Sequence, residues 1–186
     1  MRVATHTLSL LFFILFLFSC GNSKNKTHSK TTTKTTKTYP STKKPTSTSS
    51  TGSDKSDNEK INKTLSTAKS YFGTKYKYGG TDKKGIDCSG LMCVSYQSVG
   101  VQLPRTSNEQ STIGSRVYIG ELALGDLIFF GDSPNSKKIT HVGIISYVSP
   151  KSIKFIHGST RAGVVESELL SDWYKPRYIK AVRPLK

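Results

Sequence analysis

The sequence predicts an α+β domain in which helices come first and a five- to six-stranded antiparallel sheet follows. Three observations lead to this fold class. Apolar residues recur at helical spacing between Ile61 and Val99, β-branched residues gather in short runs after Gly114, and clusters of turn-forming residues separate those runs. Because consecutive runs are joined by short turns, an antiparallel meander packed on the helices is expected.

The first helix is expected to begin at a capping box formed by Ser56 and Glu59, and Gly73 is placed to end it. Residues 79–85 hold two adjacent glycines and show no periodicity, so they are expected to form a loop. The apolar positions of this first helix are Ile61, Leu65, Ala68 and Phe72.

A second helix is expected from Cys88 to the residues just before Gly100, with Cys88 in its first turn. A short third helix is expected over 107–113, where Thr106 and Glu109 stand in capping-box relation. Strands are then expected at 117–119, 126–130, 139–148, 153–157, 164–166 and 178–183, with hairpin turns at 132–138 and 149–151.

The N-terminus indicates an exported lipoprotein. Arg2 and the apolar run 8–18 are typical of a signal peptide over 1–19, and this run is too short to span a membrane. The sequence Leu-Phe-Ser-Cys at 17–20 is similar to a bacterial lipoprotein processing site, which implies acyl chains on Cys20. A coincidental cysteine after an ordinary signal is the alternative. We therefore expect a lipid anchor outside the cytoplasmic membrane, and the non-acidic Gly21 favours the outer membrane facing the periplasm.

Residues 20–55 are expected to be a disordered tether. Ser, Thr and Lys dominate this segment, which contains almost nothing that can be buried. As a flexible coil it would span roughly 33 Å. A solvated spacer is the simpler interpretation, and binding of its lysines to an anionic surface is the alternative. The remaining residues, 56–186, make up a single folded domain.

Cys88 has the features of a nucleophile. At a helix N-terminus a thiol faces free backbone amides and the positive end of the helix dipole, which lowers its pKa. Small residues around it leave room for a substrate backbone. The alternative, a buried packing cysteine, suits Cys93 better, because it lies about 140° around the helix from Cys88. We expect Cys93 to belong to the core.

His141 and His157 lie on neighbouring predicted strands and could serve as a general base and the group that orients it. Each alone could equally be a structural histidine. A two-residue turn pairs residues whose numbers have an odd sum, whereas 141 and 157 have an even sum. If both rings share one face, the hairpin must contain an odd-length turn around Pro150 or a bulge.

Six sequence motifs resemble those of the NlpC-type papain-like cell-wall endopeptidases and occur in the same order. The closest likeness is to lipoprotein murein endopeptidases. The resemblance covers roughly residues 64–185, nearly the whole folded domain. The motifs are YKYGG at 76–80, GIDCSG at 85–90, LPR at 103–105, GDLIFF at 125–130, HVGI at 141–144 and FIHGS at 155–159.

The resemblance implies a papain-like cysteine peptidase that cleaves peptidoglycan peptides with no metal and no organic cofactor. It implies that Cys88 is the nucleophile, His141 the general base and His157 the residue that orients the base. The scissile bond is either the D-alanyl–diaminopimelate crosslink or the γ-D-glutamyl–diaminopimelate bond of the stem.

The resemblance also assigns residues around the nucleophile. Tyr76 can face the oxyanion together with the Cys88 amide. Asp87 and Ser89 line the substrate groove, and Asp87 either pairs with a substrate amine or caps the helix. Arg105 is either structural or binds a stem-peptide carboxylate.

The net charge of +16, of which +9 lies in residues 61–186, would draw the protein to the carboxylates of peptidoglycan. Export removes nucleic acid as a partner, and we expect a monomer. Three distant cysteines exclude a disulfide-dense mini-protein and a four-cysteine zinc knuckle. Two other functions stay open: a structural lipoprotein that only binds murein, and a zinc hydrolase with Cys88, His141 and His157 as ligands.

Overall fold

The computed structural model describes residues 53–185 of the chain. The signal peptide, the lipid attachment at Cys20 and nearly all of the tether, as predicted from the sequence, lie outside these residues. No helix in the described part is both long and apolar enough to cross a membrane.

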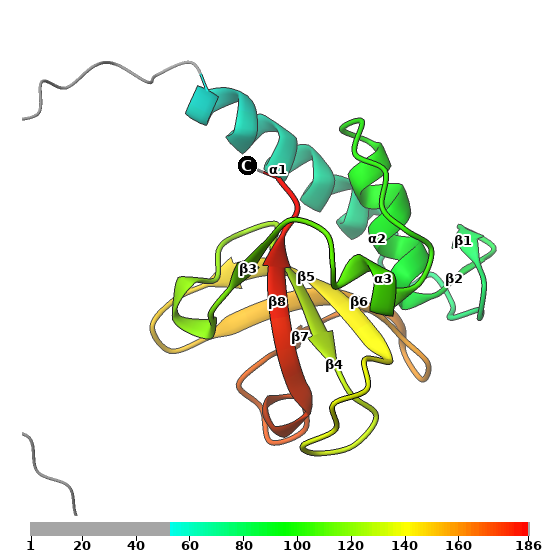
Figure 1. The fold of residues 1–186 in the computed structure, drawn as a ribbon. Helices are drawn as coiled ribbons and strands as arrows, with labels where there is room; N and C mark the ends of the chain where they lie inside the picture. Colours follow the sequence, from blue (N-terminus) through cyan, green and yellow to red (C-terminus); the bar gives the residue numbers. More distant parts are fainter. Residues whose placement is uncertain (1–52, 186) are drawn as a thin grey trace, which may run out of the picture. The chain divides into compact units, whose positions relative to one another are not determined.

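The α+β prediction is confirmed: helices precede a six-stranded antiparallel sheet with strand order β3-β8-β4-β5-β6-β7 (Figure 1). The two-stranded β1-β2 hairpin stands apart from this sheet. Along the chain the elements are α1 (Ser53–Ser70), β1 (Thr81–Asp82), β2 (Gly85–Ile86), α2 (Cys88–Gln97), α3 (Ser107–Gln110), β3 (Ser115–Val117), the 3-10 helix η1 (Ile119–Glu121), β4 (Leu127–Phe130), β5 (His141–Val148), β6 (Ile153–Ser159), β7 (Gly163–Glu168), the 3-10 helix η2 (Lys175–Arg177) and β8 (Tyr178–Arg183).

Helix α1 begins at Ser53, so the prediction that Ser56 caps it is wrong. Asp57 lies within the helix and pairs with Lys60, three residues further on, at 3.4 Å. Leu65 and Ala68 are buried as predicted. Phe72 is 47% exposed, because the helix ends at Ser70 and the chain turns before reaching it.

Several other boundaries differ from the sequence predictions. The glycine-rich stretch 79–85 is not wholly a loop, because it contains the short hairpin of β1 and β2. Helix α3 is one turn long, although its predicted capping box between Thr106 and Glu109 is present. Strand β3 ends at Val117, and Ile119 starts a 3-10 helix in place of the predicted strand.

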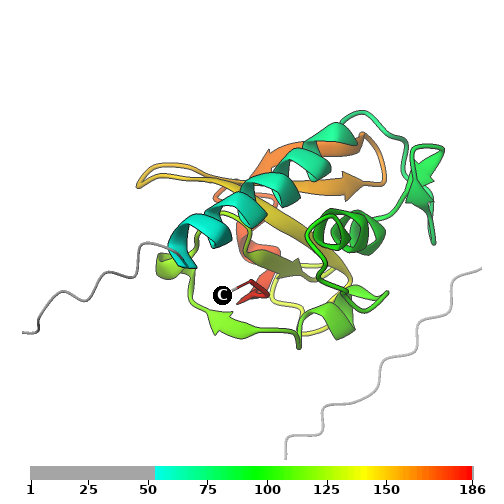
Figure 2. The same cartoon turned by 90° about the horizontal axis from the view of Figure 1, so that it is seen from above.

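The sheet is buried on both faces. Along β4, Leu127 and Phe129 pack with the helices, whereas Ile128 and Phe130 pack in a second cluster on the other face. Alternate residues of a strand point to opposite faces of the sheet. A strand that packs in a core on each face must therefore be apolar at every position. Figure 2 shows α1 running across the strands, and α2 packs against α1, β5 and β6.

The β5-β6 hairpin contains the irregularity that the two histidines required. Val148 pairs with Ile153 across a four-residue turn, which would place His141 and His157 on opposite faces. A register shift between Ile145 and Tyr147 adds one unpaired residue to β5. Beyond this shift, paired residues have numbers with an even sum, which returns His141 and His157 to the same face. The prediction of a bulge or an odd turn is therefore confirmed, and the bulge is the form it takes.

Candidate active site

Cys88 is the first residue of α2, and Asp87 before it is the N-cap. Asp87 has extended backbone angles, and its Oδ1 accepts a 2.7 Å hydrogen bond from the Gly90 amide. The Cys88 side chain packs in the same core cluster as Val142, the residue after His141, and the Val142 backbone N–H acts to lower the pKa of its thiol. Helix α2 thus presents Cys88 to the strand that carries His141.

The structure contradicts the expectation that the pKa of Cys88 is lowered. Cys88 is only 7% exposed, and burial raises the pKa of its thiol above the ordinary value; the negative charge of Asp87 raises it further. Amides at the helix start and at Val142 act in the opposite direction but do not outweigh burial. Without substrate the sulfur is therefore held as a thiol.

His141 and His157 share one face of the sheet and are directly hydrogen-bonded. His141 Nε2 lies 2.9 Å from His157 Nδ1, and the two rings are nearly perpendicular at 87°. Burial lowers the pKa of His141 to about 4. Burial and the neighbouring His141 lower the pKa of His157 to about 3. At neutral pH both imidazoles are uncharged, which leaves His141 able to accept a proton.

Two residues that the sequence reasoning missed complete this chain of hydrogen bonds. Ser167 Oγ on β7 lies 3.0 Å from His157 Nε2, and the Tyr174 hydroxyl lies 3.1 Å from the same nitrogen. Both residues are distant from His157 in sequence and belong to no recognisable motif. Only the pairing of His157 with Val165 across β6 and β7 brings Ser167 near the ring.

Asp87, Ser89 and Arg105 form one network beside the nucleophile. The Arg105 guanidinium contacts both Asp87 oxygens, at 2.6 and 3.0 Å, and also the Ser89 hydroxyl at 2.9 Å. Gly79 N–H donates to Asp87 Oδ2 at 2.8 Å. Burial acts to raise the pKa of Asp87, but the hydrogen bonds from Arg105 and the two amides outweigh it and hold that pKa below its usual range. The oxygens of Asp87 are therefore engaged as the helix cap and as the partner of Arg105.

Cys93 is half-buried, so the prediction that it is a core residue is too strong. Its sulfur lies 3.4 Å from the Pro104 carbonyl oxygen, and Gln110 Nε2 donates to it at 3.4 Å. Cys93 is placed between α2 and the chain before α3, on a different side of the helix from Cys88. Within residues 53–185 the hydrogen-bond partners of this sulfur are two backbone oxygens and the Gln110 amide, and this environment fits a packing role.

The groove at the site consists of two adjoining hollows that share Tyr76 and Thr140. The cysteine-side hollow has a volume of about 370 Å³, and the histidine-side hollow has a volume of about 550 Å³. The first is lined by Tyr76, Asp87, Cys88, Ser89, Arg105 and Thr140, among others. The second is lined by Thr140, His141, His157, Arg161, Trp173 and Arg177, among others. All seven site residues predicted from the sequence within the domain therefore border this groove or its floor.

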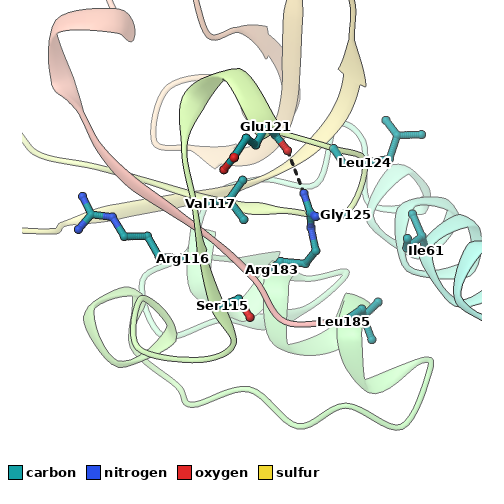
Figure 3. A pocket seen from close by; sticks show the side chains of 10 residues that line it. Ile61, Ser115, Arg116, Val117, Glu121, Leu124, Gly125, Arg183 and Leu185 are labelled. Atoms are coloured by element: carbon teal, nitrogen blue, oxygen red, sulfur yellow. Dashed lines mark hydrogen bonds between the residues drawn. The ribbon is translucent and has the colours of Figure 1, made fainter. Parts of the chain in front are cut away.

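A third hollow, of about 700 Å³, lies away from this groove between α1, β3 and the end of β8 (Figure 3). Arg183 crosses it, donating to the Glu121 backbone oxygen at 3.0 Å and to Asp126 at 2.7 and 2.9 Å. Arg116 points away from the other labelled side chains in Figure 3. Across residues 53–185, no three His, Cys, Asp or Glu side chains are grouped to hold a metal ion.

A helix whose N-terminus carries a cysteine, packed on an antiparallel sheet that carries the two histidines, is the fold of papain-like cysteine peptidases. The sequence model described as the NlpC/P60 family matches residues 73–183, and the chain belongs to that family. The resemblance seen in the sequence motifs is thereby confirmed.

The chain is similar to two curated relatives whose names describe peptidases. It is 37% identical over 119 residues to the probable endopeptidase NlpC homolog of Haemophilus influenzae, covering 63% of this chain and 60% of the relative. It is 38% identical over 114 residues to the murein DD-endopeptidase MepS/murein LD-carboxypeptidase of Escherichia coli K12, covering 61% of this chain and 57% of the relative. The chain thus spans less than two thirds of either relative.

Solved structures of the family share the fold. An NlpC/P60 family protein from Bacillus cereus superposes with a TM-score of 0.61 at 31% identity, covering 68% of this chain and 40% of that one. A lipoprotein-like NLP/P60 family protein from Staphylococcus aureus gives a TM-score of 0.59 at 30% identity, covering 69% and 42%. A third solved structure, the NlpC/p60 domain of the peptidoglycan hydrolase SagA, gives a TM-score of 0.54 at 28% identity, covering 66% of this chain and 97% of that one.

Proposed function

We propose that this chain is a cysteine endopeptidase that hydrolyses peptide bonds in peptidoglycan, at D-alanyl–diaminopimelate crosslinks or γ-D-glutamyl–diaminopimelate bonds. The observation that carries the proposal is the 2.9 Å contact between His141 Nε2 on β5 and His157 Nδ1 on β6. Cys88 packs in the same core cluster as Val142, the residue after His141. The names of the murein endopeptidase relatives support the choice of substrate.

The proposed mechanism starts from a neutral thiol and a neutral imidazole. If His141 Nε2–H donates to His157 Nδ1, then Nδ1 of His141 carries a free lone pair and can accept the Cys88 proton. His157 in turn donates from Nε2 to Ser167 or Tyr174. His157 thereby fixes the tautomer of the general base His141, as the third residue does in other catalytic triads.

The Cys88 sulfur then attacks the peptide carbonyl as its proton moves to His141. The oxyanion is stabilised by the Cys88 backbone N–H and the Tyr76 hydroxyl. Collapse of the tetrahedral intermediate breaks the C–N bond, leaves a thioester on Cys88 and transfers the proton from His141 to the leaving amine. Water, deprotonated by His141, hydrolyses the thioester and regenerates the thiol.

In this proposal Asp87 and Arg105 shape the cysteine-side hollow, and Ser89 lines it. Asp87 is 5% exposed and its pair with Arg105 is partly open to solvent, so Arg105 is the member that a substrate carboxylate can reach. We place the enzyme outside the cytoplasmic membrane, held by acyl chains on Cys20 and acting as a monomer. Labelling with a radioactive fatty acid, lost in Cys20→Ala, tests the anchor.

Digestion of purified murein tests the activity. The wild-type protein is expected to release peptides whose masses identify the cleaved bond, whereas Cys88→Ser and His141→Ala release none while remaining folded. Cys93→Ala is the matched control, because it removes a thiol from the same helix outside the groove, and it should retain activity. Turnover by Cys88→Ser, or a folded but inactive Cys93→Ala protein, would reject the assignment.

A further inference from the structure

The histidine-side hollow has cationic groups that the proposed mechanism does not use. Arg161 and Arg177 line it, and Asp132 is the acidic residue among its lining residues, which leaves a formal charge of +1. Neither arginine forms an ion pair within residues 53–185. The cysteine-side hollow differs, because its Arg105 is neutralised by Asp87.

Arg177 is held in one orientation but retains free donors. Its Nη1 donates to the Trp173 backbone oxygen at 2.7 Å, and its guanidinium lies 3.8 Å from the centre of the Trp173 ring. Its Nε is buried and has no hydrogen-bond partner in the described part of the chain. Because Nε is buried, a ligand cannot reach it, whereas Nη2 has no hydrogen-bond partner in residues 53–185 and is the donor left for a ligand.

The mechanism determines which part of a substrate enters this hollow. The acyl half stays bonded to Cys88 in the cysteine-side hollow, whereas the amine half is protonated by His141. The hollow lined by His141 therefore receives the leaving amine and the residue that carries it. In peptidoglycan the residue at the two proposed scissile bonds is a diamino acid, which also bears carboxylates.

We propose that Arg177, with Arg161, binds a carboxylate of the leaving diamino acid and so determines specificity on the amine side of the scissile bond. This inference depends on the proposed function. A planar guanidinium fixed over an indole is preorganised to bind a carboxylate through two parallel hydrogen bonds. Trp173 is 62% exposed and offers an apolar surface to the carbon chain of the same residue.

Three synthetic peptides test this assignment with the purified full chain. One has a leaving diamino acid with both carboxylates free. The second carries a carboxamide on the carbon that holds the scissile nitrogen, and the third carries it on the distal carbon. The wild-type protein is expected to cleave one of the two carboxamide peptides with a kcat/KM roughly 10- to 100-fold lower than that for the peptide with free carboxylates. The affected position identifies the carboxylate that is bound.

Arg177→Ala is expected to remove that preference by slowing the free peptide to the rate of the disfavoured amide, with the amide itself unchanged. Arg177→Lys should keep part of the preference, because it retains the charge but loses the planar fork. Arg161→Ala changes an exposed side chain and should reduce the preference without affecting folding. Arg116→Ala is the matched control, because it removes one exposed arginine from the region of the third hollow (Figure 3); it should leave the preference unchanged.

Equal cleavage of all three peptides by the wild-type protein would overturn the inference while leaving the proposed function intact. An equal loss on the free and amidated peptides in both Arg177→Ala and Arg161→Ala would also overturn it, because it would indicate a structural role. A wild-type protein that cleaves none of the peptides and no murein would reject the proposed function, and the inference with it.

Discussion

In the proposed mechanism, the Cys88 thiol can be activated only when Nδ1 of His141 is unprotonated and free to accept its proton. His157 acts on this nitrogen only indirectly, by accepting a hydrogen bond on the opposite side of the ring. The hydroxyl oxygens of Ser167 and Tyr174 can accept a hydrogen bond from the N–H that His157 must then carry at Nε2. This arrangement requires hydrogen bonding at position 157 and does not require a group that titrates.

Substitution of His157 tests this requirement. His157→Asn and His157→Gln are expected to retain part of the kcat, because an amide oxygen can still accept from His141. His157→Ala should lower kcat by roughly 10²- to 10⁴-fold, because the correct tautomer is no longer favoured. Steady-state kinetics on murein peptides measures the effect, with far-UV circular dichroism as the folding control. An Ala variant with undiminished kcat would leave Cys88 and His141 as a dyad.

The lowered pKa of His141 gives a second prediction at this scale. Because its pKa is about 4, the imidazole stays neutral and active down to that pH and is protonated only below it. The acid limb of the kcat/KM profile is therefore expected near pH 4, well below the ordinary histidine pKa of 6.5. An acid limb near pH 6.5 would show that His141 titrates as an exposed histidine.

At the level of secondary structure, the start of α2 holds both the nucleophile and its supporting network. Asp87 caps the helix and binds Arg105, so the position of Cys88 depends on a buried carboxylate that must stay ionised. Its folded-state pKa is lowered, so this ionisation stabilises the protein above the unfolded-state pKa of 3.8 and is lost as the pH falls below it.

Arg105→Ala is expected to lower the free energy of unfolding by roughly 1–2 kcal/mol at pH 7, a modest value because Arg105 is partly exposed. The difference from the wild-type protein should shrink as the pH falls from 3.8, the unfolded-state pKa, through the lower folded-state pKa, where the native Asp87 becomes protonated. Urea titrations at several pH values measure both quantities, and Arg116→Ala serves as the control. A difference independent of pH would mean that Arg105 contributes by packing alone.

At the level of the whole molecule, the net charge of +16 strengthens the long-range attraction between the protein and its proposed anionic substrate. Most of the exposed cations have no paired acid in the described residues, so long-range attraction to an anionic polymer should be strong at low salt and screened at high salt.

The inactive Cys88→Ser protein is expected to co-sediment with insoluble murein at low ionic strength and to be released as NaCl rises from about 0.05 to 0.5 M. Murein whose stem carboxylates have been amidated should retain less of it at every salt concentration. Binding that does not change with salt would indicate recognition by neutral contacts and would remove the role proposed for the charge.

The fold class, the order of the main helices and strands and the helix N-terminus that carries Cys88 could all be predicted from the sequence, as could the irregular hairpin required if the two histidines share a face. These features depend on local periodicity, capping residues and residue parity, which are properties of short segments. Element boundaries such as the start of α1 were less accurate, because several polar residues in a row can each begin a helix.

Tertiary packing sets the acidity of Cys88, the partners of His157 and the positive charge of the hollow beside His141. The sequence suggested a lowered thiol pKa from the helix dipole, but burial among α1, α2 and the sheet outweighs that effect. Ser167, Tyr174, Trp173 and Arg177 reach the site from β7 and the chain leading to β8, across strand pairings that no local pattern encodes. Burial and long-range contacts arise only when distant segments pack, so their effects on pKa and specificity cannot be read from neighbouring residues.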